Sequence, residues 1–219
     1  SYCDLLLERK LLEVGGQSAT PEVNSSDGVS SWLARCGDVR KRAEYALYLS
    51  TRFLGKGFGL LDMGLDNLTL GRTYLLEATL RHGNSVDAVN VEGLITLLQR
   101  AQQHLDQSVA LLRQGVEQTV LPRGLLARAA LARVSSQLIV DHSPLTKKDY
   151  LKKANRDLTE VAQIAGRGNM LIFQIEAALE RCRLSLVPED QAQARIKLDV
   201  AQARVKRTER HYVPDVPRW

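Results

Sequence analysis

Residues 70–74 read Leu-Gly-Arg-Thr-Tyr, and a helix-forming stretch further along the chain carries Ala101, Leu105 and Ser108. Positions i, i+4 and i+7 of an α-helix lie on one face, so these three residues form a stripe with a small side chain at each end. A small residue on such a stripe lets a neighbouring helix approach closely, as a stack of helical hairpins requires. The same spacing occurs at Ala43/Leu47/Ser50, Ala101/Leu105/Ser108, Ala154/Leu158/Val161 and Ala194/Leu198/Ala201.

The composition of the chain favours an all-α protein. The 219 residues are 44% hydrophobic and 25% charged, but only 5% aromatic, and the good helix formers Ala, Leu, Arg, Glu and Gln dominate. The formal net charge is +5, with both signs mixed along most helices, as in an ordinary soluble protein. The chain does not begin with Met, so we expect it to be part of a longer protein.

Helical periodicity, interrupted by Gly and Pro, divides the chain into eight helices joined mostly by short loops. Short connections force consecutive helices to run antiparallel. We expect an irregular insertion over 15–31, with Asp38 as the N-cap of the helix that follows, and an extended tail over 212–219. All of it forms one domain, 1–219. The expected helices span about 2–14, 39–54, 59–82, 91–114, 121–140, 147–166, 169–186 and 189–211.

The 70–74 segment resembles the first helix of a tetratricopeptide repeat, in which Leu-Gly-x-x-Tyr precedes a second helix with Ala, a large residue and another small one. In the next unit Ala129 and Ala132 stand at the Gly and Tyr positions, and in the last unit Cys182 and Ser185 do so. The resemblance implies a right-handed α-α superhelix of about four helical hairpins. The second-helix motifs lie 58, 53 and 40 residues apart, however, against about 34 in a regular array. A generic helical bundle is the alternative.

Three segments also look like the C-terminal repeat regions of large bacterial signalling NTPases. They are residues 2–7 (Tyr-Cys-Asp-Leu-Leu-Leu), 60–72 (Leu-Leu-Asp-Met-Gly-Leu-Asp-Asn-Leu-Thr-Leu-Gly-Arg) and 121–129 (Leu-Pro-Arg-Gly-Leu-Leu-Ala-Arg-Ala). This likeness implies a sensor or scaffold segment of a larger bacterial regulatory protein, and it does not identify the effector.

The resemblance also implies a partner-binding groove. In tetratricopeptide folds the first helices line the concave surface, partly through positions one and four after the Gly site. Carried over to this chain, the lining residues are Arg72, Leu75, Arg133, Arg183 and Leu186, with Arg123 and Glu176 six positions before that site. Four arginines over one concavity would clamp carboxylates of an acidic peptide. The alternative is that they pair with local acids such as Asp66 and Glu176.

No motif indicates enzymatic chemistry, a cofactor or a metal. Residues 55–59 (Gly-Lys-Gly-Phe-Gly) lack the spacing of a phosphate-binding loop, and we interpret them as a linker. The histidines His82, His104, His142 and His211 are scattered without metal-ligand spacing. Asp62 and Asp66 share a helix face, where solvation or hydrogen bonds to a neighbouring helix are expected. The odd number of widely spaced cysteines, Cys3, Cys36 and Cys182, favours buried thiols in a reducing compartment.

Two basic clusters leave an alternative function open. They are Lys147/Lys148/Lys152/Lys153/Arg156 and Arg204/Lys206/Arg207/Arg210. Each would contact phosphates, but Asp149, Asp157, Glu160 and Glu209 intervene, so we interpret both as solvated helix faces.

The sequence therefore predicts a non-enzymatic, cytoplasmic protein-binding module without a membrane segment. An exposed apolar terminal face would also let two chains pair. A helical domain associated with nucleic acid is the alternative function.

Overall fold

The computed structural model describes residues 26–52, 59–84, 91–115, 119–138 and 147–184, together with residues 196 and 199. Six helices make up this part of the chain, and it contains no strand. The prediction of an all-α protein is therefore confirmed for the residues described. The helices are α2 (Ser26–Arg52), α3 (Leu60–Asn84), α4 (Val91–Gln114), α5 (Leu121–Leu138), α6 (Lys147–Arg167) and α7 (Leu171–Leu184).

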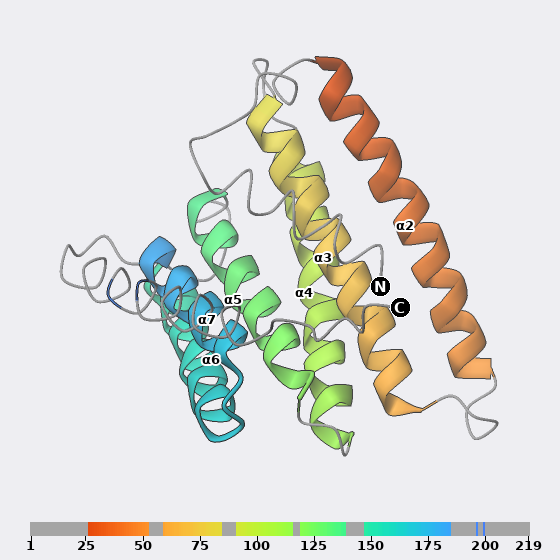
Figure 1. Ribbon diagram of the computed structural model, residues 1–219. Helices are drawn as coiled ribbons and strands as arrows, with labels where there is room; N and C mark the ends of the chain where they lie inside the picture. Colours follow the sequence, from red (N-terminus) through yellow and green to blue (C-terminus); the bar gives the residue numbers. More distant parts are fainter. Residues whose placement is uncertain are drawn as a thin grey trace, which may run out of the picture.

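The helices cross the molecule in chain order, with α2 at one end and α6 and α7 at the other (Figure 1). Each helix contacts the next one along the chain. Helix α5 also contacts both α3 and α7, so these three alternate helices are neighbours in space as well. Five of the six helices lie within a few residues of the ranges expected from the sequence.

Helix α2 is the exception, because it begins at Ser26 rather than near residue 39. Residues 26–31 are thus helical and not irregular, and Asp38 lies in mid-helix, where it cannot be an N-cap. Val29 and Cys36 lie two turns apart on the same face of α2, and both are buried against Leu76 and Leu80 of α3. This burial outweighs the turn-forming composition around Gly28 and the low helix propensity of Gly37.

Several predictions concern residues outside the described part of the chain. They are the helix over 2–14, most of the helix over 189–211, the motif Ala194/Leu198/Ala201, the groove residue Leu186, the basic cluster at 204–210 and the tail over 212–219.

Helices α3 and α4 approach each other closely where two glycines of α3 face leucines of α4. A Cβ on Gly71 would lie 2.5 Å from Cγ of Leu105, and one on Gly64 would lie 2.8 Å from Cδ2 of Leu112. Ser108 donates a hydrogen bond of 2.8 Å to the carbonyl of Gly64 inside this contact. The Gly71–Leu105 contact joins the 70–74 segment to the predicted stripe of α4, whereas the Gly64–Leu112 contact was not predicted. Ala101, Leu105 and Ser108 are all fully buried.

The hydrophobic core continues from this hairpin across α5. Ala127, Leu131 and Val134 on one side of α5 join the apolar side chains of α3 and α4. Leu125 and Ala129 on another side join those of α6 and α7, together with Val109 and Leu112 of α4. The predicted stripe Ala154/Leu158/Val161 of α6 lies in this second cluster, and all three of its residues are fully buried. Helix α5 therefore connects the two halves of the described structure.

A polar group lies within the α3–α4 contact. Nδ1 of His104 lies 2.9 Å from Oδ1 of Asn67, and the His104 ring stacks on Tyr74 with ring centres 5.7 Å apart. Burial lowers the pKa of His104, although the charge of Glu44 opposes this effect. His104 is thus a structural residue of the hairpin, and the Tyr of the Leu-Gly-x-x-Tyr motif is one of its two partners.

Substitution of Gly71 by Ala should strain the α3–α4 contact. Leu105 lies within 3.0 Å of the added methyl group, whereas a Cβ on Gly37 of α2 meets nothing within 4 Å. We expect Gly37→Ala to stabilise the protein by about 0.5–1 kcal/mol through helix propensity. The unfolding free energy of Gly71→Ala should be about 2 kcal/mol lower than that of Gly37→Ala, because overpacking against Leu105 opposes the gain in helix propensity. Denaturant unfolding measures both, and equal stability of the two variants would contradict the close contact.

His104 should make the protein sensitive to mild acid. The pKa of His104 is lower in the folded protein than in the unfolded chain, where it is about 6.5. Between these two pKa values the unfolded chain binds a proton and the folded protein does not, which favours unfolding. The stability that is present above the unfolded pKa of His104 is therefore lost as the pH falls from that value to the folded pKa. We expect His104→Gln to lose less unfolding free energy than the wild type between pH 7 and pH 5. An identical loss in the two proteins would show that His104 does not contribute.

Candidate functional site

A cavity of about 220 Å³ lies between α3, α5 and α7. Every described residue predicted for the groove borders it, and these residues come from all three helices. They are Arg72 and Leu75 of α3, Arg123 and Arg133 of α5, and Glu176 and Arg183 of α7. The structure thus brings together in one place side chains that are separated by up to 111 positions in the sequence.

The two helices that contribute most to the cavity present regular stripes to it. On α5, Arg123, Leu126, Ala130 and Arg133 recur at steps of three and four, which keeps them on one face. On α7, Phe173, Glu176, Leu179, Glu180 and Arg183 do the same. The cavity is therefore a consequence of helix periodicity together with the contacts of α5 with α3 and α7.

Glu180 holds two arginines of the cavity in place. Nε of Arg133 donates a hydrogen bond of 2.6 Å to Oε1, and an Nη atom of Arg183 donates one of 3.0 Å to Oε2. The Glu180 side chain is only 6% exposed, against 20% for Arg133 and 32% for Arg183. Part of the alternative interpretation is thus correct, because two of the arginines pair with an acid. That acid is neither Asp66 nor Glu176.

The remaining two arginines differ in exposure. Arg72 is buried at 8% exposure and interacts with other parts of the protein, as does Glu176. Arg123 is exposed at the edge of the cavity, and no hydrogen bond or ion pair engages its guanidinium within the described part of the chain. Arg123 is therefore the arginine most accessible to an incoming carboxylate.

Apolar side chains form much of the remaining wall. Leu75, Leu126, Phe173 and Leu179 border the cavity, and Ile172 lies at its edge with 63% of its surface exposed. Four arginines face two glutamates here, so the lining carries an excess of positive charge. This combination suits a ligand that carries both a carboxylate and a large apolar side chain.

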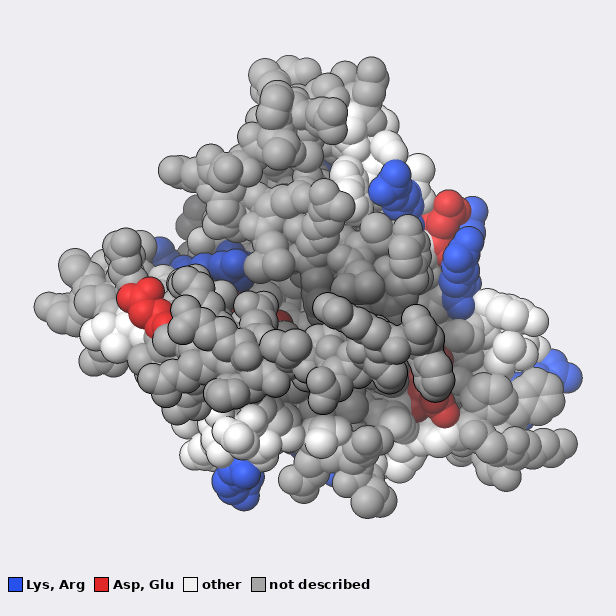
Figure 2. All heavy atoms as spheres, in the orientation of Figure 1, with Lys and Arg blue, Asp and Glu red and all other residues white. Residues whose placement is uncertain are grey.

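The charges elsewhere on this side of the molecule are dispersed. On the face shown in Figure 2, the described basic and acidic side chains lie in small separate groups and not in one continuous area of a single sign.

Sequence reasoning missed Glu180, Leu126, Ala130 and the apolar residues of α7. The signal was present in part, since Leu126 and Ala130 follow Arg123 at steps of three and four, and Glu180 follows Glu176 by four. The choice of Glu180 over Asp66 as the partner of Arg133 depends on how α7 lies against α5, which no local spacing specifies. Asp66 instead accepts a hydrogen bond of 3.3 Å from Ser50, and burial raises the pKa of the Asp66 carboxyl.

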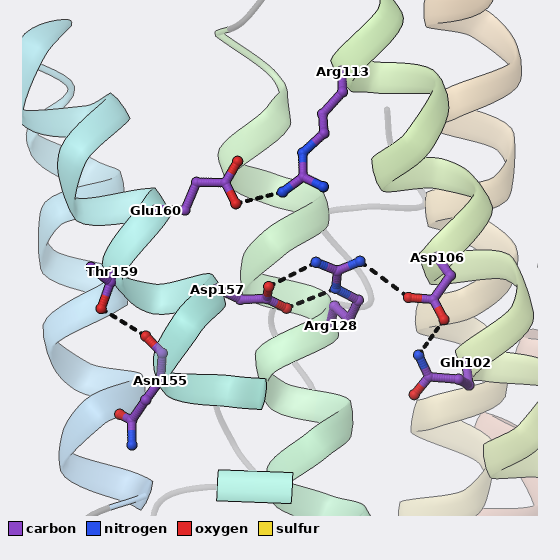
Figure 3. Close-up of polar contacts among 8 residues, drawn as sticks. All are labelled: Gln102, Asp106, Arg113, Arg128, Asn155, Asp157, Thr159 and Glu160. Carbon is purple, nitrogen blue, oxygen red and sulfur yellow. Dashed lines mark hydrogen bonds and ion pairs between the residues drawn. The ribbon is translucent and has the colours of Figure 1, made fainter. Parts of the chain in front are cut away.

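A second ionic cluster lies across α4, α5 and α6, and Figure 3 shows its contacts. Arg128 of α5 donates two hydrogen bonds of 2.7 Å to the two carboxylate oxygens of Asp157 on α6. Arg128 also reaches Asp106 of α4 at 3.1 Å. Nearby, Arg113 of α4 pairs with Glu160 of α6 at 2.5 Å. Since the Asp157 side chain is only 6% exposed, this cluster holds α6 against α5.

The described residues contain no group of three or more His, Cys, Asp or Glu arranged to hold a metal ion. Cys36 and Cys182 are free thiols, and burial raises the pKa of Cys36 to about 11. A thiol with such a pKa is almost entirely protonated at neutral pH and is a poor nucleophile. None of the described helices combines the length and the apolar character needed to cross a bilayer.

Comparison with known proteins adds no relative. No family model matches the chain, and neither the curated proteins nor the solved structures include a match.

Loss of the Asp157 carboxylate should destabilise the fold. Asp157→Asn leaves Arg128 without its paired charge in a mostly buried position, which we expect to cost about 3 kcal/mol of unfolding free energy. The same change at Asp106, whose side chain is 51% exposed, should cost less than about 1 kcal/mol. Guanidinium unfolding of the two variants tests this difference. Equal costs would mean that Arg128 is held by its surroundings and not by Asp157.

Proposed function

We propose that this chain is a non-enzymatic, tetratricopeptide-like interaction module that binds an acidic polypeptide segment in the cavity between α3, α5 and α7. One observation carries the proposal. The described groove residues that the repeat resemblance implies, taken from three helices, all border one cavity with an arginine-rich and apolar lining.

The neighbour relations of the helices support the repeat interpretation. In a superhelix of hairpins the first helices of successive units touch along the concave side. Helices α3, α5 and α7 would be those first helices, and α5 contacts both of the others. The close α3–α4 contact at Gly71 and Leu105 corresponds to the contact within one unit. A right-handed superhelix is accordingly part of the proposal.

The chemistry of the cavity defines the proposed ligand. An Asp or Glu side chain of the partner accepts hydrogen bonds from Arg123, which has no carboxylate partner within the described residues. A neighbouring Leu, Ile or Phe packs on Ile172 and Phe173, and burial of one such side chain contributes about 1.5–3 kcal/mol. The module would serve as a scaffold or sensor segment of a larger cytoplasmic, bacterial signalling protein.

Selection from a library of random peptides tests this function. We expect the wild-type chain to enrich peptides in which Asp or Glu stands close to a large apolar residue. Arg123→Glu should weaken the binding of the selected peptides at least tenfold, because it replaces an attractive charge with a repulsive one. Ile172→Ser should weaken binding as well, since Ile172 is the exposed apolar residue at the cavity edge.

Two variants on α2 serve as matched controls. Arg42→Glu makes the same change of charge at an exposed position away from the cavity. Tyr45→Ser removes an apolar side chain that is 64% exposed, close to the 63% of Ile172. Neither control should affect peptide binding. Enrichment without acidic residues, or equal loss in Arg123→Glu and Arg42→Glu, would contradict the proposal.

A further inference from the structure

The outward face of α6 carries a stripe of basic and neutral polar side chains. Residues at steps of three and four along this helix are exposed and lie on one face, over a length of about 28 Å at 1.5 Å per residue. They are Lys148, Lys152, Arg156, Thr159, Gln163 and Arg167. Not one of them is acidic, and Lys147 and Lys153 lie beside the stripe.

The acids that separate these cations in the sequence are buried or partly buried. Asp157 is buried and bound by Arg128, and Glu160 is engaged by Arg113 (Figure 3). Asp149, in the first turn, also takes part in an interaction within the protein. Within the described part of the chain, no hydrogen bond or ion pair engages the side chains of Lys147, Lys148, Lys152, Lys153, Arg156 or Arg167. Two of the three acids on α6 that the sequence interpretation set against this cluster are therefore engaged by arginines of other helices.

Two hollows adjoin the stripe and share Arg113 and Arg156. The larger, of about 800 Å³, is also bordered by Thr159, Gln163 and Arg167, and by Glu160, which pairs with Arg113. The smaller, of about 260 Å³, is bordered by Lys153 and by the Arg128–Asp157 pair. Helix α6 with Arg113, Arg128 and Asp106 carries eight Lys and Arg residues against four acids, an excess of four positive charges. The part of α6 from Lys153 to Arg167 thus borders two hollows, and the helix and its surroundings carry an excess of positive charge.

We propose that this α6 face binds the phosphate backbone of duplex nucleic acid, independently of the groove. Cations spaced along a rigid line suit a polymer of regularly spaced charges. No aromatic side chain is exposed on α6, because Tyr150 is 7% exposed, so the base stacking used by single-strand binders is absent from this helix. No large apolar side chain is exposed there either, which a membrane-surface helix would insert into lipid. Contacts to phosphates alone make the binding independent of sequence.

The experiment is a salt titration of binding to a random-sequence DNA duplex, followed by fluorescence anisotropy. Each phosphate contact adds about 0.9 to the slope of log K against log salt. The double variant Lys152→Gln/Arg156→Gln should therefore lower that slope by about 1.8. Between 50 and 200 mM salt, both proteins should lose affinity, and the factor lost by the double variant should be about ten times smaller than the factor lost by the wild type.

The matched control is Lys41→Gln/Arg42→Gln on α2, which removes the same two charges from exposed positions on another helix. It should keep the wild-type slope. Absence of salt-dependent binding by the wild type, or an equal loss in the two double variants, would overturn the proposal. Tighter binding to poly-aspartate or to anionic vesicles than to the duplex, with the same dependence on Lys152 and Arg156, would overturn it in favour of an acidic protein or a membrane.

Discussion

The burial of α5 on two sides is the constraint on which the rest of the described structure depends. One side joins the cluster formed with α3 and the first part of α4, and another joins the cluster formed with the last part of α4, α6 and α7. The three arginines of α5 belong to neither cluster. Arg123 and Arg133 lie toward the cavity, whereas Arg128 lies toward α4 and α6. The helix that connects the two cores therefore also separates the two charged regions.

The two regions use their charges differently. Around the cavity, Glu180 neutralises part of the arginine charge, so the exposed Arg123 and the apolar wall would select a ligand. On the α6 side, Asp157 and Glu160 are occupied by arginines of other helices, which leaves the exposed cations of α6 unopposed. The same type of ion pair thus weakens one basic surface and strengthens the other.

The sequence predicted what periodicity controls and missed what tertiary contact controls. The Gly71–Leu105 contact and the stripe at Ala154, Leu158 and Val161 follow from the spacing of small and large residues. The predicted groove residues border one cavity because alternate helices, α3, α5 and α7, lie next to one another, as the repeat resemblance implies. The start of α2 could not be predicted, because the burial of Val29 and Cys36 on α3 outweighs their turn-rich surroundings. The partners of Arg133 and Asp157 depend on how three helices lie together, and local sequence does not contain that information.

The position of Glu180 has a consequence for any ligand of the cavity. This carboxylate belongs to the protein and already occupies Arg133 and Arg183, so it acts as a built-in competitor for acidic ligands. A partner that uses only Arg123 leaves the competitor in place and binds weakly. A partner that displaces Glu180 gains two more arginines but must expose a buried carboxylate or draw α7 away from α5. The number of acidic groups on a ligand would therefore matter less for binding than its ability to displace the Glu180 carboxylate from Arg133 and Arg183.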